Sequence, residues 1–196
     1  MNVQRLTDRM IADDGMTEAE LTEAVKQRKQ SATEILYRRY VGHLSSVCYR
    51  YVANEEDVKD VLQESFVRIF SSMERFSYRG EGSLKAWMTK IVVSRALTFL
   101  RNNKRLLTTD GNATEMDIGE EAPPDTGLLS DDELHALIRT LPDGYRTVLN
   151  LFVFEDKSHK EIAEILGIRE SSSASQYFHA KNLLARKIKD YLSKRR

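Results

Sequence analysis

Cysteine is nearly absent from the sequence, with Cys48 as the single thiol. One thiol cannot form an internal disulfide, and scattered histidines without a second cysteine do not build a zinc finger, so both scaffolds are excluded. We expect Cys48 to be a buried, small apolar residue. No apolar run approaches the ~20 residues of a membrane-spanning helix, and residues 1–15 lack the apolar core of a secretory signal. We therefore expect a cytoplasmic protein without membrane insertion.

Proline and glycine are also scarce, with three and nine residues among 196. This scarcity argues against a many-turned β fold, and abundant Leu, Ala, Glu, Lys and Arg favour helices. The sequence also lacks a phosphate-binding glycine loop, a Ser/His/Asp ordering and paired carboxylates beside a base. We expect an all-α protein that is not an enzyme and holds neither a cofactor nor a metal.

The formal net charge is zero, but the charges are unevenly distributed along the chain. Residues 31–105 carry 13 basic and 8 acidic side chains and residues 141–196 carry 11 and 7, whereas residues 106–140 carry 1 and 9. The stretch 106–130 has no helical period and is typical of a linker. We predict four parts: a flexible N-terminal extension (1–16), a small helical domain (17–105), a flexible acidic linker (106–130) and a second small helical domain (131–196).

Capping boxes, in which Ser or Thr is followed three residues later by Glu, mark helix starts. The sequence contains the pairs Thr17/Glu20, Ser31/Glu34, Ser130/Glu133 and Ser158/Glu161. Two further helices are expected, over 55–73 with Asn54 as its cap and over 84–105 with Ser83 as its cap. These signals predict helices in both domains.

The predicted helix over 55–73 has two unlike faces when successive residues are turned by 100°. The apolar face comprises Val58, Leu62, Phe66, Ile69, Phe70 and Met73. The opposite face comprises Asp57, Asp60, Glu64 and Arg68. A solvated surface is the commoner explanation of such a polar face. The functional explanation is a docking surface for a basic partner.

The segment 75–90 places aromatic and basic residues around a glycine-rich turn. Three aromatic side chains are candidates for stacking on unpaired bases, at ~1–3 kcal/mol per base: Phe76, Tyr78 and Trp87. Three cations are candidates for phosphate contacts: Arg75, Arg79 and Lys85. The alternative is that Phe76 and Trp87 belong to the hydrophobic core.

The next predicted helix carries a polar stripe suited to a nucleic-acid backbone. The stripe comprises Lys90, Ser94, Thr98, Arg101 and Arg105. Arg95 lies instead on the apolar arc of this helix. That position requires an acidic partner for Arg95 or incomplete cover of the arc.

Residues 158–181 have the spacing of a helix-turn-helix, with a first helix that ends at Gly167. We expect the second helix to bury Tyr177, Ala180, Leu184, Ile188 and Tyr191. We expect it to turn outward Ser172, Ser175, Gln176, His179 and Arg186. Ser and Gln side chains hydrogen-bond base edges or phosphates, although hairpins with this spacing also occur as scaffolds.

Taken in this order, the segments resemble the sigma-70 family of bacterial transcription initiation factors, in particular its small two-domain extracytoplasmic-function (ECF) class. Residues 57–70 are similar to the region that docks on RNA polymerase. Residues 76–91 are similar to the segment that recognises and melts the minus-ten element, where a base is flipped into a pocket. Residues 141–146 and 158–181 are similar to the minus-35-binding domain. The resemblance implies three partners: core RNA polymerase, promoter DNA (duplex minus-35 and melted minus-ten) and an anti-sigma factor.

The resemblance also implies site residues. The polymerase-binding residues would be Asp57, Asp60, Gln63, Glu64 and Arg68. The minus-ten residues would be Phe76, Tyr78, Arg79, Trp87, Lys90, Ser94, Thr98 and Arg101. The minus-35 residues would be Ser172, Ser173, Ser175, Gln176, His179 and Lys181. The chain departs from the family pattern at Ser94 and Thr98, which leaves the preferred flipped base open. It also departs at Ala174 and His179, where a basic residue is common in the family, so that minus-35 affinity would depend on Ser175, Gln176, Lys181 and tethering by polymerase.

Two other classes of function stay open on the sequence alone. A helix-turn-helix transcriptional regulator that binds duplex DNA without polymerase-dependent melting explains residues 141–196, but not the aromatic loop beside an acidic face. A protein that works only through protein contacts, such as an anti-sigma factor or an adaptor, leaves the basic stripes unexplained. Promoter opening by the chain together with core RNA polymerase discriminates among the three.

Overall fold

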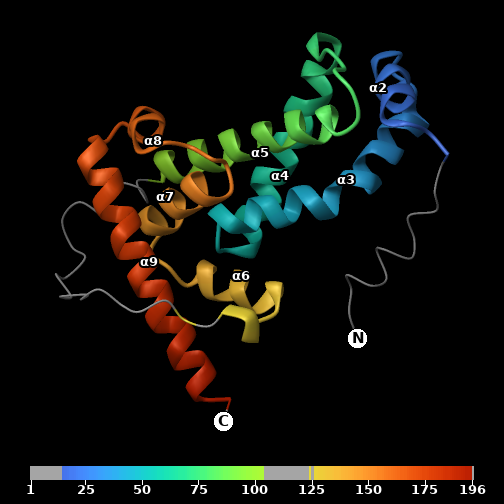
Figure 1. Ribbon diagram of the computed structural model, residues 1–196. Helices are drawn as coiled ribbons and strands as arrows, with labels where there is room; N and C mark the ends of the chain where they lie inside the picture. The colour runs from blue at the N-terminus through green and yellow to red at the C-terminus, as the bar shows by residue number, and fades with distance from the viewer. Residues whose placement is uncertain (1–14, 104–123, 125, 196) are drawn as a thin grey trace. The chain divides into compact units, whose positions relative to one another are not determined.

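The structure is a computed structural model that describes residues 15–103, 124 and 126–195. Its α-helices are α2 (Glu18–Lys26), α3 (Gln30–Tyr51), α4 (Glu55–Ser72), α5 (Ser83–Asn102), α6 (Asp131–Arg139), α7 (Asp143–Val153), α8 (His159–Leu166) and α9 (Glu170–Ser193), with short 3-10 helices η1 (Met73–Arg75) and η3 (Thr126–Leu128). The described residues contain no β-strand (Figure 1), so the all-α prediction is confirmed. Most of the predicted N-terminal extension (1–16) and acidic linker (106–130) lies outside the described residues.

The chain divides into two compact units. The first unit contains α2, α3 as far as Tyr49, α4, η1 and α5 as far as Ala96. The second contains Arg50–Ala53, the end of α5 and α6 to α9. The division therefore falls inside α5, whereas the sequence places the domain boundary after residue 105.

The core of the first unit is built from the apolar faces of its four α-helices. The side chains without exposed surface include Leu21, Leu36, Leu44, Ile69, Leu84, Met88 and Val92. The apolar face predicted for α4 is confirmed, because Val58, Phe66, Ile69 and Met73 are buried and the other two members, Leu62 and Phe70, are half-buried. Cys48 is also fully buried, as expected, and its burial raises the pKa of the thiol to about 12.

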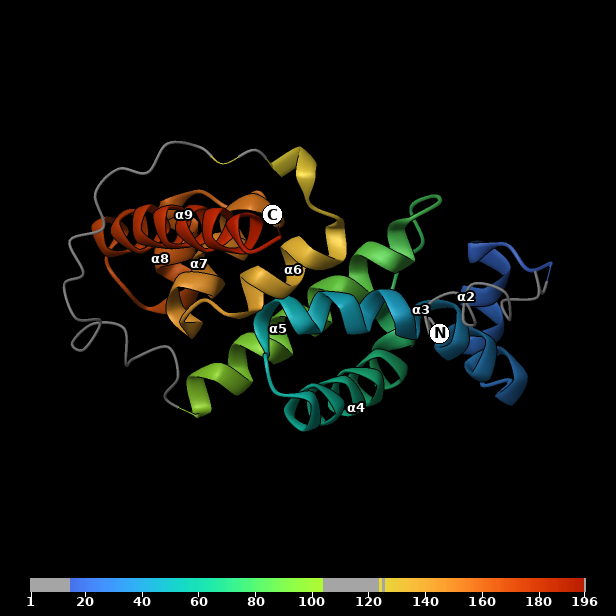
Figure 2. The same cartoon turned by 90° about the horizontal axis from the view of Figure 1, so that it is seen from below.

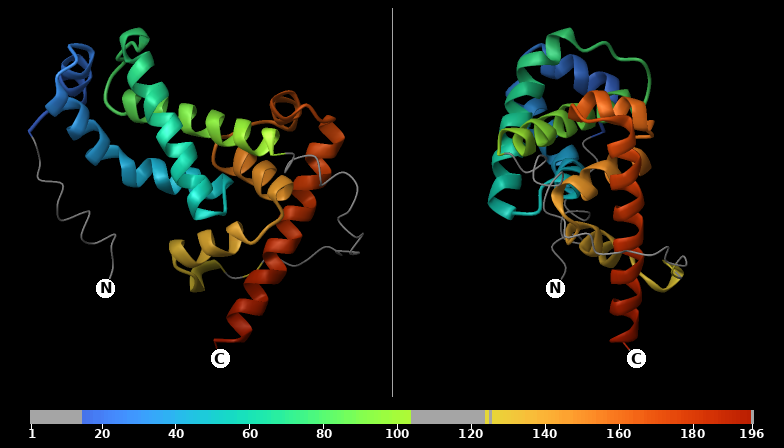
Figure 3. Two further views of the ribbon diagram at one scale, coloured as in Figure 1. Left: turned by 180° about the vertical axis from the view of Figure 1, so that it is seen from behind. Right: turned by 90° about the vertical axis from the view of Figure 1, so that its left-hand side faces the viewer.

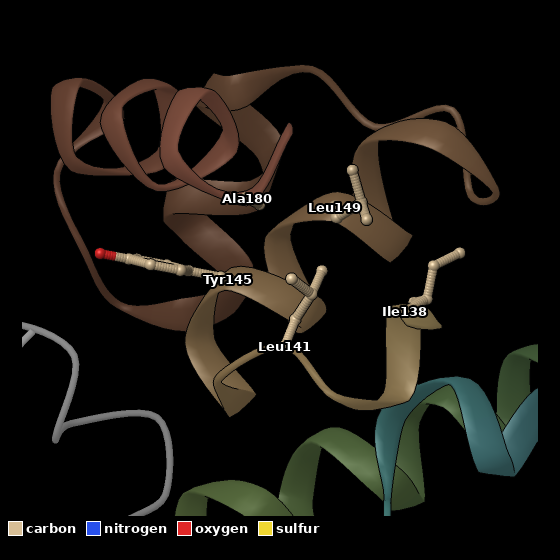
Figure 4. Close-up of a cluster of buried hydrophobic side chains, with 5 residues drawn as sticks. All are labelled: Ile138, Leu141, Tyr145, Leu149 and Ala180. Carbon is tan, nitrogen blue, oxygen red and sulfur yellow. The ribbon is translucent and has the colours of Figure 1, made fainter. Parts of the chain in front are cut away.

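The long helix α9 organises the second unit and contacts α6, α7 and α8 (Figure 2). A cluster of buried residues joins α6, α7 and α9: Ile138, Leu141, Tyr145, Leu149 and Ala180 (Figure 4). Tyr177 and Leu184 pack against this cluster. Ala180 and Ile188 are buried, as the sequence predicts for α9.

Arg146 on α7 is the largest fully buried side chain, with 2% of its surface exposed. Its guanidinium donates two hydrogen bonds to the Tyr51 carbonyl oxygen, at 2.8 and 3.2 Å. It donates further bonds to the carbonyl oxygens of Arg139 at 3.0 Å and Leu141 at 2.9 Å. Asp143 supplies the opposite charge. The buried cation is therefore paired and hydrogen-bonded, as a charge inside a protein must be.

Three of the four predicted capping boxes are present, at Thr17, Ser130 and Ser158. In the box before α8, the hydroxyl of Ser158 accepts from the backbone N–H of Glu161, and the Glu161 carboxylate accepts from the backbone N–H of Ser158. The backbone bond from Ser158, followed by the bond from Lys157, lowers the pKa of Glu161 to about 2. Asn54 caps α4 as predicted.

The fourth capping box, at Ser31, is wrong. Helix α3 begins at Gln30, so Ser31 lies inside its first turn. The chain enters α3 through Arg28, whose φ of 58° lies in the left-handed region, and a turn before Gln30 displaces the helix start. Ser83 likewise is the first residue of α5 and not its cap, and α5 ends at Asn102, before the predicted residue 105.

Candidate nucleic-acid and protein interfaces

The polar side of α4, called here the α4 outer face, comprises Asp57, Asp60, Gln63, Glu64, Val67 and Arg68. Asp57 is half-buried, and the other five are exposed. The structure therefore brings all five predicted docking residues onto one surface. Val67, 65% exposed, was missed by the sequence analysis. Its position on this face could have been predicted from the spacing, because Val67 lies three residues after Glu64 and four after Gln63, on the same side of the helix.

Arg95 finds its acidic partner within the first unit. Its guanidinium forms an ion pair with Glu64 of α4. This pair accounts for an arginine on the apolar arc of α5, one of the two explanations that the sequence left open. Glu64 is therefore engaged in an ion pair between α4 and α5. Asp60, in contrast, has no such intramolecular ion pair among the described residues.

The loop between η1 and α5, residues 77–82, is called here the glycine loop. Gly80 and Gly82 have φ of 116° and 83°, a left-handed conformation that side chains with a Cβ rarely adopt. Tyr78 is 37% exposed, and Arg79 is exposed beside it. Partial burial, followed by the nearby Glu81 carboxylate, raises the pKa of Tyr78, so its hydroxyl stays protonated.

Phe76 does not belong to the exposed surface, which corrects its predicted role as a stacking residue. Only 7% of Phe76 is exposed, and its ring packs on the Trp87 ring with centroids 4.8 Å apart. Trp87 is half-buried. The core explanation therefore holds for Phe76, and this ring pair supports the base of the glycine loop.

The polar stripe of α5 is largely as predicted. Lys90, Ser94 and Arg101 are exposed, and Thr98 is half-buried. Their spacing of four, four and three residues keeps them on one side of the helix. Arg105 lies outside the described residues.

The helix-turn-helix is present as α8 and α9, and Gly167 ends α8 with a left-handed φ of 69°. The outward face of α9, called here the α9 exposed face, differs from the predicted one. Its exposed residues are Ser171, Ala174, Ser175, Phe178 and Lys181. Ser175 and Lys181 are therefore placed as predicted. Phe178, 40% exposed, was missed.

Several residues of α9 that were predicted to face outward or to contact the minus-35 element are buried or half-buried in the structure. Ser173 is fully buried and Gln176 is 8% exposed, while Ser172 and His179 are half-buried. The Ser173 hydroxyl lies 3.1 Å from Nδ1 of His159, the first residue of α8, so Ser173 faces α8 and not the solvent. The ring of His179 stacks on that of Tyr145 with centroids 5.8 Å apart. The predicted outward position of Gln176 is therefore wrong, and the burial of Ser173 argues against the minus-35 contact that the family resemblance implied for it.

Among the described residues, no group of three or more His, Cys, Asp or Glu side chains is arranged to hold a metal ion. In the same part of the chain, no helix is long and apolar enough to cross a membrane.

Comparison with known proteins establishes the family of the chain. The family model for Sigma-70 region 2 matches residues 36–106, and the model for Sigma-70, region 4 matches residues 131–184. The ECF RNA polymerase sigma-E factor of Haemophilus influenzae is 30% identical over 187 residues, which cover 88% of this chain and 96% of that protein. The chain is a sigma-70 family member of the ECF group.

A second curated relative agrees with this membership. The RNA polymerase sigma factor SigV of Bacillus subtilis is 30% identical over 162 residues, covering 81% of this chain and 93% of that protein. Among solved structures, CnrH in complex with the cytosolic domain of CnrY is 20% identical, with a TM-score of 0.46 over 87% of this chain and 96% of that chain.

As an ECF sigma factor, the chain binds core RNA polymerase and directs it to specific promoters for transcription initiation. Family membership favours this function over the helix-turn-helix regulator. The α4 outer face, the glycine loop and α5 lie inside the region 2 match. Helices α7 and α8 and the α9 exposed face lie inside the region 4 match. Helix α2 precedes both matches.

Proposed function

We propose that the three exposed surfaces divide the work of this sigma factor. The α4 outer face docks on core RNA polymerase, the glycine loop with the α5 stripe holds the melted minus-ten strand, and the α9 exposed face reads the minus-35 duplex. The observation that carries the proposal is the exposure of Tyr78 and Arg79 on the glycine loop. A protein that binds only duplex DNA has no need of an exposed aromatic residue on a glycine-rich loop.

Extruding a base from the duplex costs a few kcal/mol of unstacking free energy. Promoter opening therefore requires favourable contacts between the protein and the extruded base. Stacking on an aromatic side chain returns ~1–3 kcal/mol per base. With Phe76 buried, Tyr78 is the exposed stacking side chain of the loop. Arg79, Lys90 and Arg101 are exposed cations that hold the phosphates of the displaced strand.

The α4 outer face has the composition of a protein interface. Val67, 65% exposed, supplies an apolar centre, and Asp60 and Gln63 supply a polar rim. Interfaces commonly bury an apolar centre within such a rim. The acidic rim favours a basic partner through complementary charge, which raises the association rate.

The α9 exposed face has hydroxyl and apolar groups and a single cation. Phe178 and Ala174 are suited to apolar contact with thymine methyl groups, and the Ser175 hydroxyl to a base edge. Lys181 is suited to a phosphate. Without an arginine that could bind guanine through two hydrogen bonds, we expect tolerant minus-35 recognition, helped by the tether to the minus-ten contacts.

We further propose that the working domains are 17–105 and 131–196, joined by the acidic segment 106–130. An anti-sigma factor is a further expected partner. The site of action is the cytoplasm, where RNA polymerase works.

The test measures promoter opening by the purified chain with core RNA polymerase, using a fluorescent base in the minus-ten element. Tyr78→Ala and Arg79→Ala should slow opening by about tenfold or more, the equivalent of one lost stack or phosphate contact. Ser77→Ala, an exposed change in the same loop, is the matched control. Opening at the wild-type rate by both variants would remove the glycine loop from the melting step.

A further inference from the structure

Helix α2 lies beside the glycine loop, although it precedes the residues matched by the region 2 model. It contacts η1, the element that leads into the loop (Figure 3). Arg28, just after α2, also forms an ion pair with Glu74 of η1 at 2.9 Å. The chain before the matched region is therefore attached to the first end of the glycine loop.

Glu18 attaches α2 to the other end of the loop. Its Oε1 accepts a hydrogen bond from the backbone N–H of Lys85 at 3.2 Å. Lys85 is the third residue of α5, and the first four N–H groups of an α-helix have no partner within the helix. A carboxylate at this position is also favoured by the positive end of the helix dipole. Glu18 thus caps the helix that follows the glycine loop from a separate element.

The Glu18 carboxylate is itself held in place. The hydroxyl of Tyr40 on α3 donates to the same Oε1 at 3.1 Å. Burial, followed by the Glu18 charge, raises the pKa of Tyr40, so this hydroxyl remains a donor at any physiological pH. Glu18 is 2% exposed and Tyr40 is 8% exposed. One carboxylate therefore ties α2, α3 and the start of α5 together.

The second oxygen of the carboxylate, Oε2, is buried and has no hydrogen-bond partner among the described residues. Such an atom lowers stability, because its hydration is lost without replacement. An apolar residue of similar size would avoid this penalty. What Glu18 provides, and a leucine would not, is therefore an acceptor for the hydrogen bonds from Tyr40 and Lys85.

We propose that Glu18 is a positioning residue for promoter opening: through Oε1 it fixes the start of α5 and so holds the glycine loop ready for the displaced strand. This inference rests on the proposed function of the glycine loop. Gly80 and Gly82 give the loop backbone freedom, so the loop needs fixed ends. Phe76, packed on Trp87, fixes one end, and Glu18 fixes the other.

The experiment compares Glu18→Leu and Glu18→Gln in the full chain with core RNA polymerase. Glutamine keeps an acceptor oxygen for Tyr40 and Lys85, whereas leucine keeps only the bulk. We expect Glu18→Leu to slow promoter opening by about tenfold, the equivalent of one charged hydrogen bond. Its affinity for core RNA polymerase should stay unchanged, and Glu18→Gln should open promoters within about twofold of wild type.

Three results would overturn the proposal. These are normal opening by Glu18→Leu, an equal defect in Glu18→Gln, and a loss of polymerase affinity that parallels the opening defect, since the last indicates a structural role only. If Glu18→Leu does not fold, Tyr40→Phe removes one of the two donors, and normal opening by that variant counts against the proposal equally. Tyr78→Ala is measured alongside: its normal opening would instead refute the function proposed for the loop.

Discussion

Replacing Arg146 by methionine removes the hydrogen bonds of its guanidinium while keeping much of its length. The carbonyl groups of Tyr51, Arg139 and Leu141 then lose their donors. An unsatisfied buried polar group costs about 1–3 kcal/mol. Asp143 also loses its partner, but its side chain is 26% exposed and regains water.

The total loss of unfolding free energy is smaller than the sum of these individual costs, because the residues around the new side chain shift and satisfy part of the lost hydrogen bonding. Removing one member of a buried, hydrogen-bonded pair typically costs about 3–5 kcal/mol, and we expect Arg146→Met to fall in this range. For a domain of this size, with a slope of about 1–2 kcal/mol/M, the urea midpoint of the second unit should fall by roughly 1.5–5 M. Such a loss is a large part of the ~5–15 kcal/mol that stabilises a typical domain.

The two units can be followed separately because Trp87, the single tryptophan, lies in the first unit. Far-UV circular dichroism reports on helices throughout the chain, and Trp87 fluorescence reports on the first unit. We expect the dichroism transition of Arg146→Met to gain a step at low urea that is absent from the fluorescence. Arg169→Met is the control, since Arg169 is exposed and such surface changes stay within about 0.5 kcal/mol.

The reasoning is refuted if the unfolding midpoint of Arg146→Met stays within about 0.5 M of wild type. It is refuted equally if Arg169→Met has the same effect, because the loss then follows from removing a positive charge and not from the buried hydrogen bonds. Arg146→Lys is a further check. A lysine cannot reproduce the planar fork of five donors, so we expect it to restore only part of the stability.

Three further predictions concern other surfaces. Asp60→Lys should weaken binding to core RNA polymerase in a titration without changing helix content, whereas unaltered affinity would exclude the α4 outer face. Ser158→Ala should destabilise the second unit by about 1 kcal/mol. Because Glu161 has a lowered pKa of about 2 in the folded chain, its contribution is present at neutral pH and is lost as pH falls from about 4.5. Glu161→Gln should therefore remove most of this pH dependence of the unfolding midpoint, whereas Ser158→Ala should retain it, because the backbone N–H of residue 158 and Lys157 still bond the carboxylate. Phe178→Ala should relax base preference in a minus-35 sequence scan, whereas Lys181→Ala should weaken binding evenly; the reverse pattern would show that readout and backbone roles are exchanged.

The sequence by itself determined the helical class and the positions of most helix starts. The caps at Thr17, Asn54, Ser130 and Ser158 are present in the structure. The two faces of α4 are present as well. These features could be predicted because capping and helical periodicity depend on residues three or four positions apart, and any window of the sequence contains them.

Only the tertiary structure decided which side chains of the candidate sites are exposed. Phe76 is buried by Trp87, and Ser173 is buried against His159, fourteen positions away. A polar residue such as Ser173 gives no sequence signal of burial, because its partner comes from another helix. Ser173, Gln176 and Ala180 do lie on one side of α9 by helical spacing. Because Ser173 and Gln176 are polar, however, the sequence does not show that the buried face of α9 extends to them.

The same reason applies to the charged residues that organise the first unit. Glu18 reaches Lys85 across 67 positions, and Glu64 reaches Arg95 across 31. Burial of a carboxylate is unfavourable unless hydrogen bonds or an opposite charge compensate the lost hydration. That compensation exists only once distant segments have packed together, so local sequence patterns determined the helices and long-range packing decided which polar side chains remain free to bind a partner.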